Sequence, residues 1–335
     1  MTFGNNKLNL DIASSGCKFM KLVIDGANEI SPFHALGHFL ALDGFGEPSP
    51  EEKALGMPFH GEADHQEFQI ISSNKSGTVS AIAFEANLPL AQETLTRTVQ
   101  MVDGENVVYV TSELTSGLSI DRPISWAEHA TLGVPFLEGG QVRVDLSATN
   151  CRVRERKTGP IPGRLIQLRD FHWPNAPGIS GGPVDLRQVP AGTVAMDLAA
   201  CEMDPARPLA YVTALQLKHR LLFGYVFRRE DYPWLMNWMN YSGDSRAARG
   251  MEFATQPFDV SHRETVDMGR LFGVPTFRWL PAKAKITTRF LMFYAAVPQG
   301  FQQVNDVKLD AGMLTIEDHA SGKQLTLRAS LPLYI

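Results

Sequence analysis

The chain has 335 residues and a formal net charge of −5, with 44% hydrophobic and 20% charged residues. These values are typical of a folded globular protein and argue against a disordered chain. The acidic balance and the lack of a lysine- or arginine-rich run argue against nucleic acid as a partner, because phosphate binding needs clustered cations. No apolar run approaches the roughly 18 residues of a membrane span, so we expect no membrane partner.

The three cysteines, Cys17, Cys151 and Cys201, are odd in number and widely separated. Their spacing matches neither a disulfide framework nor a zinc site. We therefore expect reduced thiols, which fit a cytoplasmic location. The first residues carry no basic segment followed by an apolar one, so we also expect no secretory leader.

Taken in chain order, the predicted elements are mostly short strands between turn signals. Runs rich in β-branched and aromatic residues lie at 21–24, 78–84, 96–102, 106–111, 142–146 and 290–296. Several of them alternate apolar with polar residues, which is the pattern of a half-buried strand. Helices are predicted only at 31–42, where Ser31-Pro32 resembles an N-cap followed by the first helical residue, and at 264–272. The strand count predicts an all-β, mostly antiparallel fold.

No segment of the sequence stands out as a domain boundary. The proline- and glycine-rich stretches at 158–163 and 173–178 indicate a long loop over one face of a sandwich. We predict a single domain over residues 1–335, with its core at about 20–300 and an irregular N-terminus. The segment 178–183 matches a G-x-S-x-G pattern, but its flanking prolines favour a loop over a nucleophile elbow.

Three ionisable residues stand in short apolar or glycine-bearing segments: His60, His129 and Glu252. A single histidine in an apolar run is more often a core residue than a functional one. Together, two imidazoles that titrate near neutral pH and one carboxylate form a general acid/base set. Opening a sugar hemiacetal needs such a set, because the anomeric hydroxyl loses a proton while the ring oxygen gains one.

The motifs around these residues resemble the galactose mutarotase-like superfamily, that is, aldose 1-epimerase and its relatives. The matching segments are 58–61, 122–137 and 250–257, with weaker similarity at 278–283 and 288–294. The resemblance implies a large antiparallel β-supersandwich with its site on a concave face. It also implies that His129 protonates the ring oxygen, that Glu252 accepts the proton of the anomeric hydroxyl, and that His60 hydrogen-bonds the sugar.

The sequence departs from the aldohexose epimerase pattern at three places. Asn28-Glu29 stands where the family has Asn-Arg, and His60-Gly61-Glu62 stands where it has His-Gly-Gly. Ala130-Thr131-Leu132 lacks the family's aromatic residue. The sugar-binding aspartate has two weak candidates, Asp170 and Asp231.

Four further residues are predicted to contact the substrate. They are Glu62, beside His60, together with Trp126, Trp234 and Asn237. Trp234 and Asn237 belong to the aromatic cluster 232–241, whose rings could stack on sugar faces or pack in the core.

The leading prediction is a carbohydrate-active enzyme of the aldose 1-epimerase type that needs no cofactor and acts on a small carbohydrate. A second hypothesis is a sugar isomerase or lyase, with a divalent metal at His60, Glu62 and His65. On a strand, His60, Glu62 and Asp64 would share one face. A third hypothesis is a carbohydrate-binding protein without catalysis. The pair His34 and His38, at helical spacing, is read as structural, and the oligomeric state is left open.

Overall fold

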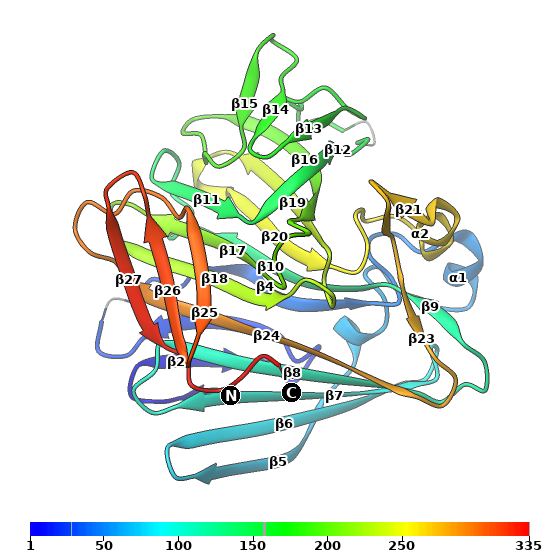
Figure 1. Cartoon of the computed structure of the whole chain (residues 1–335). Helices are drawn as coiled ribbons and strands as arrows, with labels where there is room; N and C mark the ends of the chain where they lie inside the picture. The colour runs from blue at the N-terminus through cyan, green and yellow to red at the C-terminus, as the bar shows by residue number, and fades with distance from the viewer. Residues whose placement is uncertain (28, 157–158, 335) are drawn as a thin grey trace.

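The computed structural model describes residues 1–27, 29–156 and 159–334, and two large antiparallel sheets dominate this part of the chain (Figure 1). The first sheet has ten strands in the order β1 (Thr2–Gly4), β2 (Leu8–Ile12), β3 (Phe19–Ile24), β4 (Phe33–Leu42), β10 (Trp126–Gly133), β20 (Ala248–Ala254), β19 (Trp234–Ser242), β16 (Val194–Met203), β12 (Ala148–Val153) and β13 (Asp170–His172). The second has eight, in the order β11 (Val142–Leu146), β17 (Leu209–Gln216), β18 (Leu221–Arg228), β24 (Lys285–Ala296), β8 (Val107–Ser116), β7 (Glu93–Val102), β6 (Val79–Leu88) and β5 (Gln69–Ser76). The predicted all-β, antiparallel fold is confirmed.

The remaining elements lie outside the two large sheets. They are the strand pairs β14 (Asn175–Pro177) with β15 (Pro183–Asp185), β21 (Arg270–Leu271) with β22 (Val274–Pro275) and β23 (Arg278–Leu280) with β9 (Arg122–Ile124), the sheet β25 (Asp306–Asp310), β26 (Met313–Asp318) and β27 (Lys323–Arg328), the helices α1 (Pro50–Ala54) and α2 (His262–Met268), and the 3-10 turns η1 (Ala63–His65) and η2 (Asp244–Arg246). The segment 178–183 lies in the β14–β15 hairpin that projects from the molecule in Figure 1, as the loop prediction required.

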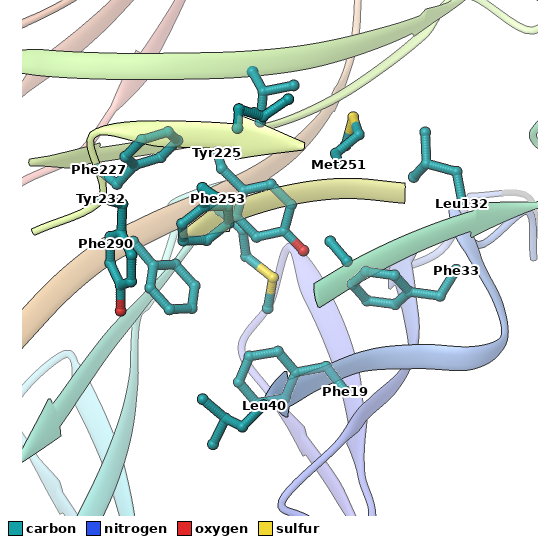
Figure 2. Packing of buried hydrophobic residues seen from close by; sticks show 14 of the residues in the cluster. Phe19, Phe33, Leu40, Leu132, Tyr225, Phe227, Tyr232, Met251, Phe253 and Phe290 are labelled. Carbon is teal, nitrogen blue, oxygen red and sulfur yellow. The ribbon is translucent and has the colours of Figure 1, made fainter. Parts of the chain in front are cut away.

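The main core lies between the two sheets, and aromatic rings from both meet there (Figure 2). Phe253 of β20 stacks on Phe227 of β18 with ring centroids 4.5 Å apart. It also meets Phe290 of β24 edge-on at 5.2 Å. Each fully buried ring contributes about 1.5–3 kcal/mol through the hydrophobic effect, so these contacts hold the ten-stranded sheet on the eight-stranded one.

The ends of the chain are more regular than the sequence predicted. The N-terminus forms β1 and β2, whose Leu8 and Leu10 are fully buried in the main core. Beyond residue 300, the sheet of β25, β26 and β27 packs a second apolar cluster against the other face of the eight-stranded sheet. The expected irregular N-terminus is therefore wrong, and the core extends past both predicted limits. The single-domain assignment stays a prediction, and Asn28 lies outside the described residues.

One predicted helix is wrong and the other is partly correct. Residues 33–42 form β4, which pairs with β10 through most of its length. The hydroxyl oxygen of Ser31 accepts the amide protons of Leu22 and Phe33 at 3.2 Å, so it fixes the start of a strand instead of capping a helix. Tertiary pairing thus overrides a local capping signal. The predicted helix at 264–272 exists as α2, shifted toward the N-terminus. None of the described helices has the length and apolar character that crossing a bilayer demands.

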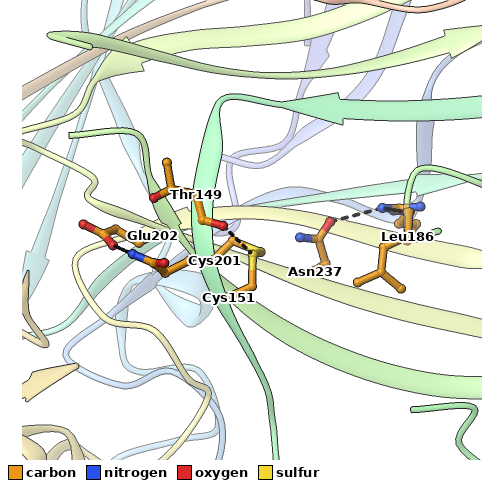
Figure 3. Close-up of a disulfide and its surroundings, with 8 residues drawn as sticks. Thr149, Cys151, Leu186, Cys201, Glu202 and Asn237 are labelled. Carbon is orange, nitrogen blue, oxygen red and sulfur yellow. Dashed lines mark hydrogen bonds between the residues drawn. A yellow bond between two sulfur atoms is a disulfide. The ribbon is translucent and has the colours of Figure 1, made fainter. Parts of the chain in front are cut away.

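The cysteines also differ from the prediction (Figure 3). Cys151 of β12 and Cys201 of β16 lie opposite each other in register and form a disulfide. Cys17 is free and buried, and burial raises the pKa of its thiol to about 12. The expectation of three reduced thiols is therefore wrong for two of them, because strand pairing joins residues that the sequence separates. The cytoplasmic location stays a prediction. It can no longer be argued from reduced thiols, since disulfides persist mainly in oxidising compartments.

Candidate active site

Four neighbouring strands of the ten-stranded sheet place one row of side chains on the face turned away from the main core. In register, His129 of β10 lies opposite Phe39 of β4 and opposite Glu252 of β20. Glu252 in turn lies opposite Met236 of β19. Directly opposed residues of antiparallel strands point to the same face, so the sheet itself brings His129 and Glu252 together.

A cavity of about 470 Å³ opens above this row. Its lining consists of Lys18, Met20, Ala35, Leu36, Phe39, Phe45, Phe59, His60, Asp64, His129, Met236, Trp238, Glu252 and Asp259. All three predicted catalytic residues, His60, His129 and Glu252, therefore share one cavity. Its volume lies within the range of about 300–1,000 Å³ that is usual for small-molecule sites.

His129 is held on three sides at the floor of the cavity. Its ring stacks on Phe39 with centroids 4.2 Å apart and planes 19° apart. Nε2 lies 3.3 Å from Oε1 of Glu252, and Nδ1 lies 3.1 Å from Oγ1 of Thr131. Burial lowers the pKa of His129 well below its usual value, and the neighbouring His60 lowers it further.

Glu252 is fully buried and poorly supplied with polar partners. Apart from the contact with His129, neither carboxyl oxygen has a hydrogen bond from the described residues. Burial raises its pKa well above the usual value, and Asp259 adds to the shift while Arg154 opposes it. The carboxyl group folds back over Gly250, where an added Cβ would stand 1.9 Å from Oε1. The glycine in the Gly250-Met-Glu252 motif thus provides the space that the carboxyl occupies.

These shifts leave a single proton for His129 and Glu252 to share. The raised pKa of the carboxyl and the lowered pKa of the imidazole both favour a neutral pair, with the proton on Glu252. We assign the Nδ1 proton of His129 to the hydrogen bond with Thr131, which leaves Nε2 for the shared proton. The pair can therefore give up one proton and take up another without a net change of charge.

His60 reaches the same cavity from a turn and not from a strand. It adopts a φ of 64°, and its Nδ1 accepts the amide proton of Gly46 at 3.1 Å. Its ring centroid lies 5.4 Å from that of His129. Burial lowers the pKa of His60 to about 4, with smaller contributions from His65 and Lys18. At neutral pH its imidazole is uncharged and carries its proton on Nε2 as a donor.

Solved structures show what this arrangement resembles, although the sequence matches no protein-family model and no curated protein. A galactose mutarotase related enzyme from Lactobacillus acidophilus aligns with a TM-score of 0.57 at 12% identity, over 88% of this chain and 97% of that chain. A galactose mutarotase-like protein from Lactobacillus casei aligns at 0.58 and 18%, over 88% and 99%. Another from Clostridium acetobutylicum aligns at 0.60 and 12%, over 88% and 94%. The chain has the galactose mutarotase-like fold.

Two of the predicted substrate contacts lie on the wrong face of this mutarotase-like sheet. Trp126 is fully buried on the core side, where its Nε1 donates to Glu128 at 3.3 Å. Asn237 also faces the core and accepts a hydrogen bond of 3.2 Å from Arg249. Neither side chain lines the cavity, because alternate residues of a strand point to opposite faces.

The other two predicted contacts are covered by loops. The carboxyl of Glu62 accepts amide protons from Leu90 and Ala91 at 3.0 and 3.2 Å. Trp234 lies under the β21–β22 region, with its Nε1 donating to the carbonyl of Pro275 at 2.8 Å. The structure therefore places none of the four predicted contacts in the cavity.

The segment 60–65 is not the strand that the metal hypothesis required. Ala63–His65 forms the turn η1, Asp64 pairs with Lys18 at 2.9 Å, and His65 bonds the carbonyl of Phe59. Within residues 1–27, 29–156 and 159–334, no group of three or more His, Cys, Asp or Glu residues is arranged to hold a metal ion. The two aspartate candidates, Asp170 and Asp231, pair with arginines outside the cavity.

The sequence did not predict several of the residues that line the cavity. Lys18 and Asp64 form an ion pair beside Phe39, and Phe59 and Asp259 come from loops far apart in the chain. Only Trp238 had a usable signal, because residues 234, 236 and 238 share one face of β19 with period two. Its ring meets His129 edge-on at 6.4 Å.

Proposed function

We propose that this protein is a carbohydrate-active enzyme that interconverts the anomers of a sugar, as an aldose 1-epimerase does. The observation that carries the proposal is the 3.3 Å contact between Nε2 of His129 and Oε1 of Glu252 on the floor of the cavity. The mutarotase-like fold supports the same class of reaction. A reaction that moves only protons needs no cofactor.

The proposed reaction begins with a cyclic sugar bound above the pair. Glu252 takes the proton of the anomeric hydroxyl while His129 gives a proton to the ring oxygen, so the ring C–O bond breaks and a carbonyl forms. Rotation about the C1–C2 bond and the reverse proton transfers close the other anomer. For these roles the shared proton must first cross the 3.3 Å contact from Glu252 to His129. His60 donates a hydrogen bond to a sugar oxygen near the reacting carbon.

Burial makes such proton transfers effective. General acid/base groups contribute about 10²- to 10⁴-fold each when they are positioned at the reacting atoms. The apolar walls supplied by Phe39, Phe45 and Met236 keep water from competing for the shared proton. The pair also regenerates itself, because each turnover takes up one proton and returns one.

The test is anomer exchange, followed by polarimetry or NMR on freshly dissolved α-sugars. Glu252→Gln and His129→Asn should each lower the exchange rate by about 10²- to 10⁴-fold. Glu138→Gln removes a carboxylate that pairs with Lys218 on the surface, and it should leave the rate unchanged. If exchange persists undiminished in both cavity variants, the proposed roles are wrong. If the protein binds sugars but exchanges none of them, it is a carbohydrate-binding protein.

A further inference from the structure

A second hollow adjoins the cavity that contains His129. It has a volume of about 420 Å³ and is lined by Gly46, Glu47, Pro48, Ser49, Pro50, Phe59, Arg154, Arg156, Met196, Leu198, Asp259, Val260, Ser261 and Glu264. We call the first hollow the His129 cavity and the second the Arg154 cavity. Phe59 and Asp259 line both, so the two hollows meet at these residues.

The same sheet face forms the floor of both hollows. The His129 cavity ends on β19 at Trp238, and Trp238 lies opposite Leu198 of the neighbouring β16. Leu198 and Met196, two residues apart on one face of β16, line the Arg154 cavity. The second hollow is therefore the continuation of the first across one further strand. A ligand that extends from one to the other follows a single surface.

The junction between the hollows carries an exposed aromatic ring. Phe59 is 48% exposed and touches His60 with ring centroids 4.0 Å apart. An aromatic ring at the junction of two hollows can stack on a flat apolar face of a ligand. The C–H faces of sugar rings are suitable partners for such a platform. Phe59 is placed to contact a ring in either hollow.

Most charged groups that line the two hollows are held by partners within the protein. Lys18 pairs with Asp64 at 2.9 Å, and the Arg154 guanidinium pairs with the Asp259 side chain and also donates to its carbonyl at 2.7 Å. Arg156 donates to the backbone carbonyls of Ile161 and Met196.

Counting side chains, the lining holds three cations (Lys18, Arg154 and Arg156) and four anions (Glu47, Asp64, Asp259 and Glu264), besides the protonated Glu252. A phosphate or carboxylate ligand needs an excess of cations. This lining has no excess of cations and contains both donors and acceptors, which suit neutral hydroxyl groups.

We propose that the ligand is a neutral oligosaccharide of at least two rings, one ring in the His129 cavity and the next in the Arg154 cavity. Each hollow alone has the volume of a small-molecule site, so a monosaccharide leaves the second one vacant. That the ring beside His129 carries the free anomeric carbon rests on the proposed function. The occupation of both hollows rests on their geometry and does not depend on turnover.

Binding measurements by calorimetry test the proposal directly on the full-length protein. Glucose is compared with maltose, cellobiose and isomaltose, and galactose with α-1,4-galactobiose. At least one disaccharide should bind ten times more tightly than its reducing-end monosaccharide. Glucose 6-phosphate should bind no better than glucose. If no disaccharide in this set gains tenfold, or if the phosphate gains it, the proposal is wrong.

A matched pair of variants locates the second ring. Met196→Trp fills the Arg154 cavity and should lower the disaccharide affinity about tenfold, to that of the monosaccharide, while glucose binding stays unchanged. Val194→Trp adds the same ring two residues earlier on the same face of β16, at a position that is 57% exposed and lines neither hollow. It should leave both affinities unchanged. Equal losses in both variants, or no loss in Met196→Trp, would place the second ring elsewhere.

The same experiments separate this proposal from the proposed function. If disaccharide preference is present and Met196→Trp abolishes it, but no sugar shows anomer exchange, the two-ring site stands and the enzymatic proposal falls. If sugars exchange anomers but no disaccharide in the set binds more tightly than its reducing-end monosaccharide, the enzymatic proposal stands and the two-ring site falls.

Discussion

Glu128 and Glu252 lie on neighbouring strands, both are fully buried, and both contact a histidine, yet their environments are opposite. Glu128 faces the core, where its oxygens receive two bonds of 3.0 and 3.1 Å from Arg97 and one contact of 2.8 Å from His38. Trp126 and Tyr232 donate to it as well, at 3.3 Å. Glu252 faces the cavity, and among the described residues its carboxyl has only the contact with His129.

The difference shows what burial does to a carboxyl when partners are present and when they are absent. Burial acts to raise the pKa of both groups. At Glu128 the charge of Arg97 and the bond from His38 more than offset it, and the pKa falls to about 2. At Glu252 nothing comparable opposes burial, so the pKa rises. Glu128 is a permanent anion that joins the sheets, whereas Glu252 retains a proton that can be transferred.

The largest expected effect is on stability, and it separates the two acids. Glu128→Gln leaves the Arg97 guanidinium buried without its counter-charge, and loss of one partner of a buried ion pair costs about 3–5 kcal/mol. Glu252 is protonated in the folded state but ionised in the unfolded state at pH 7, so Glu252→Gln removes the cost of protonating it and should raise, not lower, the free energy of unfolding at this pH. Chemical denaturation at pH 7 followed by circular dichroism measures both. Equal losses in the two variants would refute the comparison.

The sequence allowed prediction of the pair but not of its surroundings. The His129 and Glu252 motifs carry distinctive residue types, and the strands that hold them are neighbours, so resemblance sufficed to bring them together. Trp126 was misplaced because β10 is covered on both faces and gives no periodicity from which the facing can be read. Asn237 was misplaced because it lies one residue from Trp238 and so points to the opposite face of β19. In β10 all eight residues are buried.

The fold was predictable in class and less so in detail. Alternating patterns sufficed for most of the strands, but β4 was read as a helix because a capping signal at Ser31 was stronger than any local evidence of pairing with β10. The Cys151–Cys201 disulfide likewise depends on the register of β12 with β16, which no local pattern reveals. Loop residues such as Lys18 and Phe59 reach the cavity only through tertiary structure.

A substitution that displaces the Glu252 carboxyl should lower the anomer-exchange rate without unfolding the protein. In Gly250→Ala the new methyl group occupies the place of the Glu252 carboxyl, which must shift by about 1 Å, and a misplacement of that size costs about a hundredfold in kcat. The double variant Gly250→Ala/Glu252→Asp retracts the carboxyl and should recover part of the loss. Anomer-exchange rates and unfolding curves are measured together. An unchanged kcat would mean that the carboxyl position does not matter.

His60, which lies beside His129 and Glu252, should give the free energy of unfolding a pH dependence, and this is the next effect in size. Unfolded His60 binds a proton near pH 6.5, but folded His60 does so only near pH 4. Between these values the unfolded state holds more protons, so the free energy of unfolding falls as the pH is lowered through this window. From pH 7 to 5 the loss amounts to about 2 kcal/mol at 1.36 kcal/mol per pH unit.

His60→Asn removes this contribution, and asparagine tolerates the positive φ of residue 60. Denaturation at pH 7 and pH 5 should show a smaller pH dependence in the variant than in the parent protein. The difference between the two proteins isolates His60, because His129 acts in both. An identical pH dependence would show that His60 is not buried as a neutral ring.

The smallest expected effect concerns Thr131, which touches the pair only through His129. Its hydroxyl accepts the Nδ1 proton of His129 at 3.1 Å and so keeps Nε2 directed at Glu252. Thr131→Val removes a hydrogen bond worth about 0.5–1.5 kcal/mol and should lower kcat by up to about tenfold. KM should stay unchanged because Thr131 does not line the cavity. Thr131→Ser keeps the hydroxyl and should restore the rate. If Thr131→Ser loses as much rate as Thr131→Val, then Thr131 acts through packing, and the stacking on Phe39 alone orients His129.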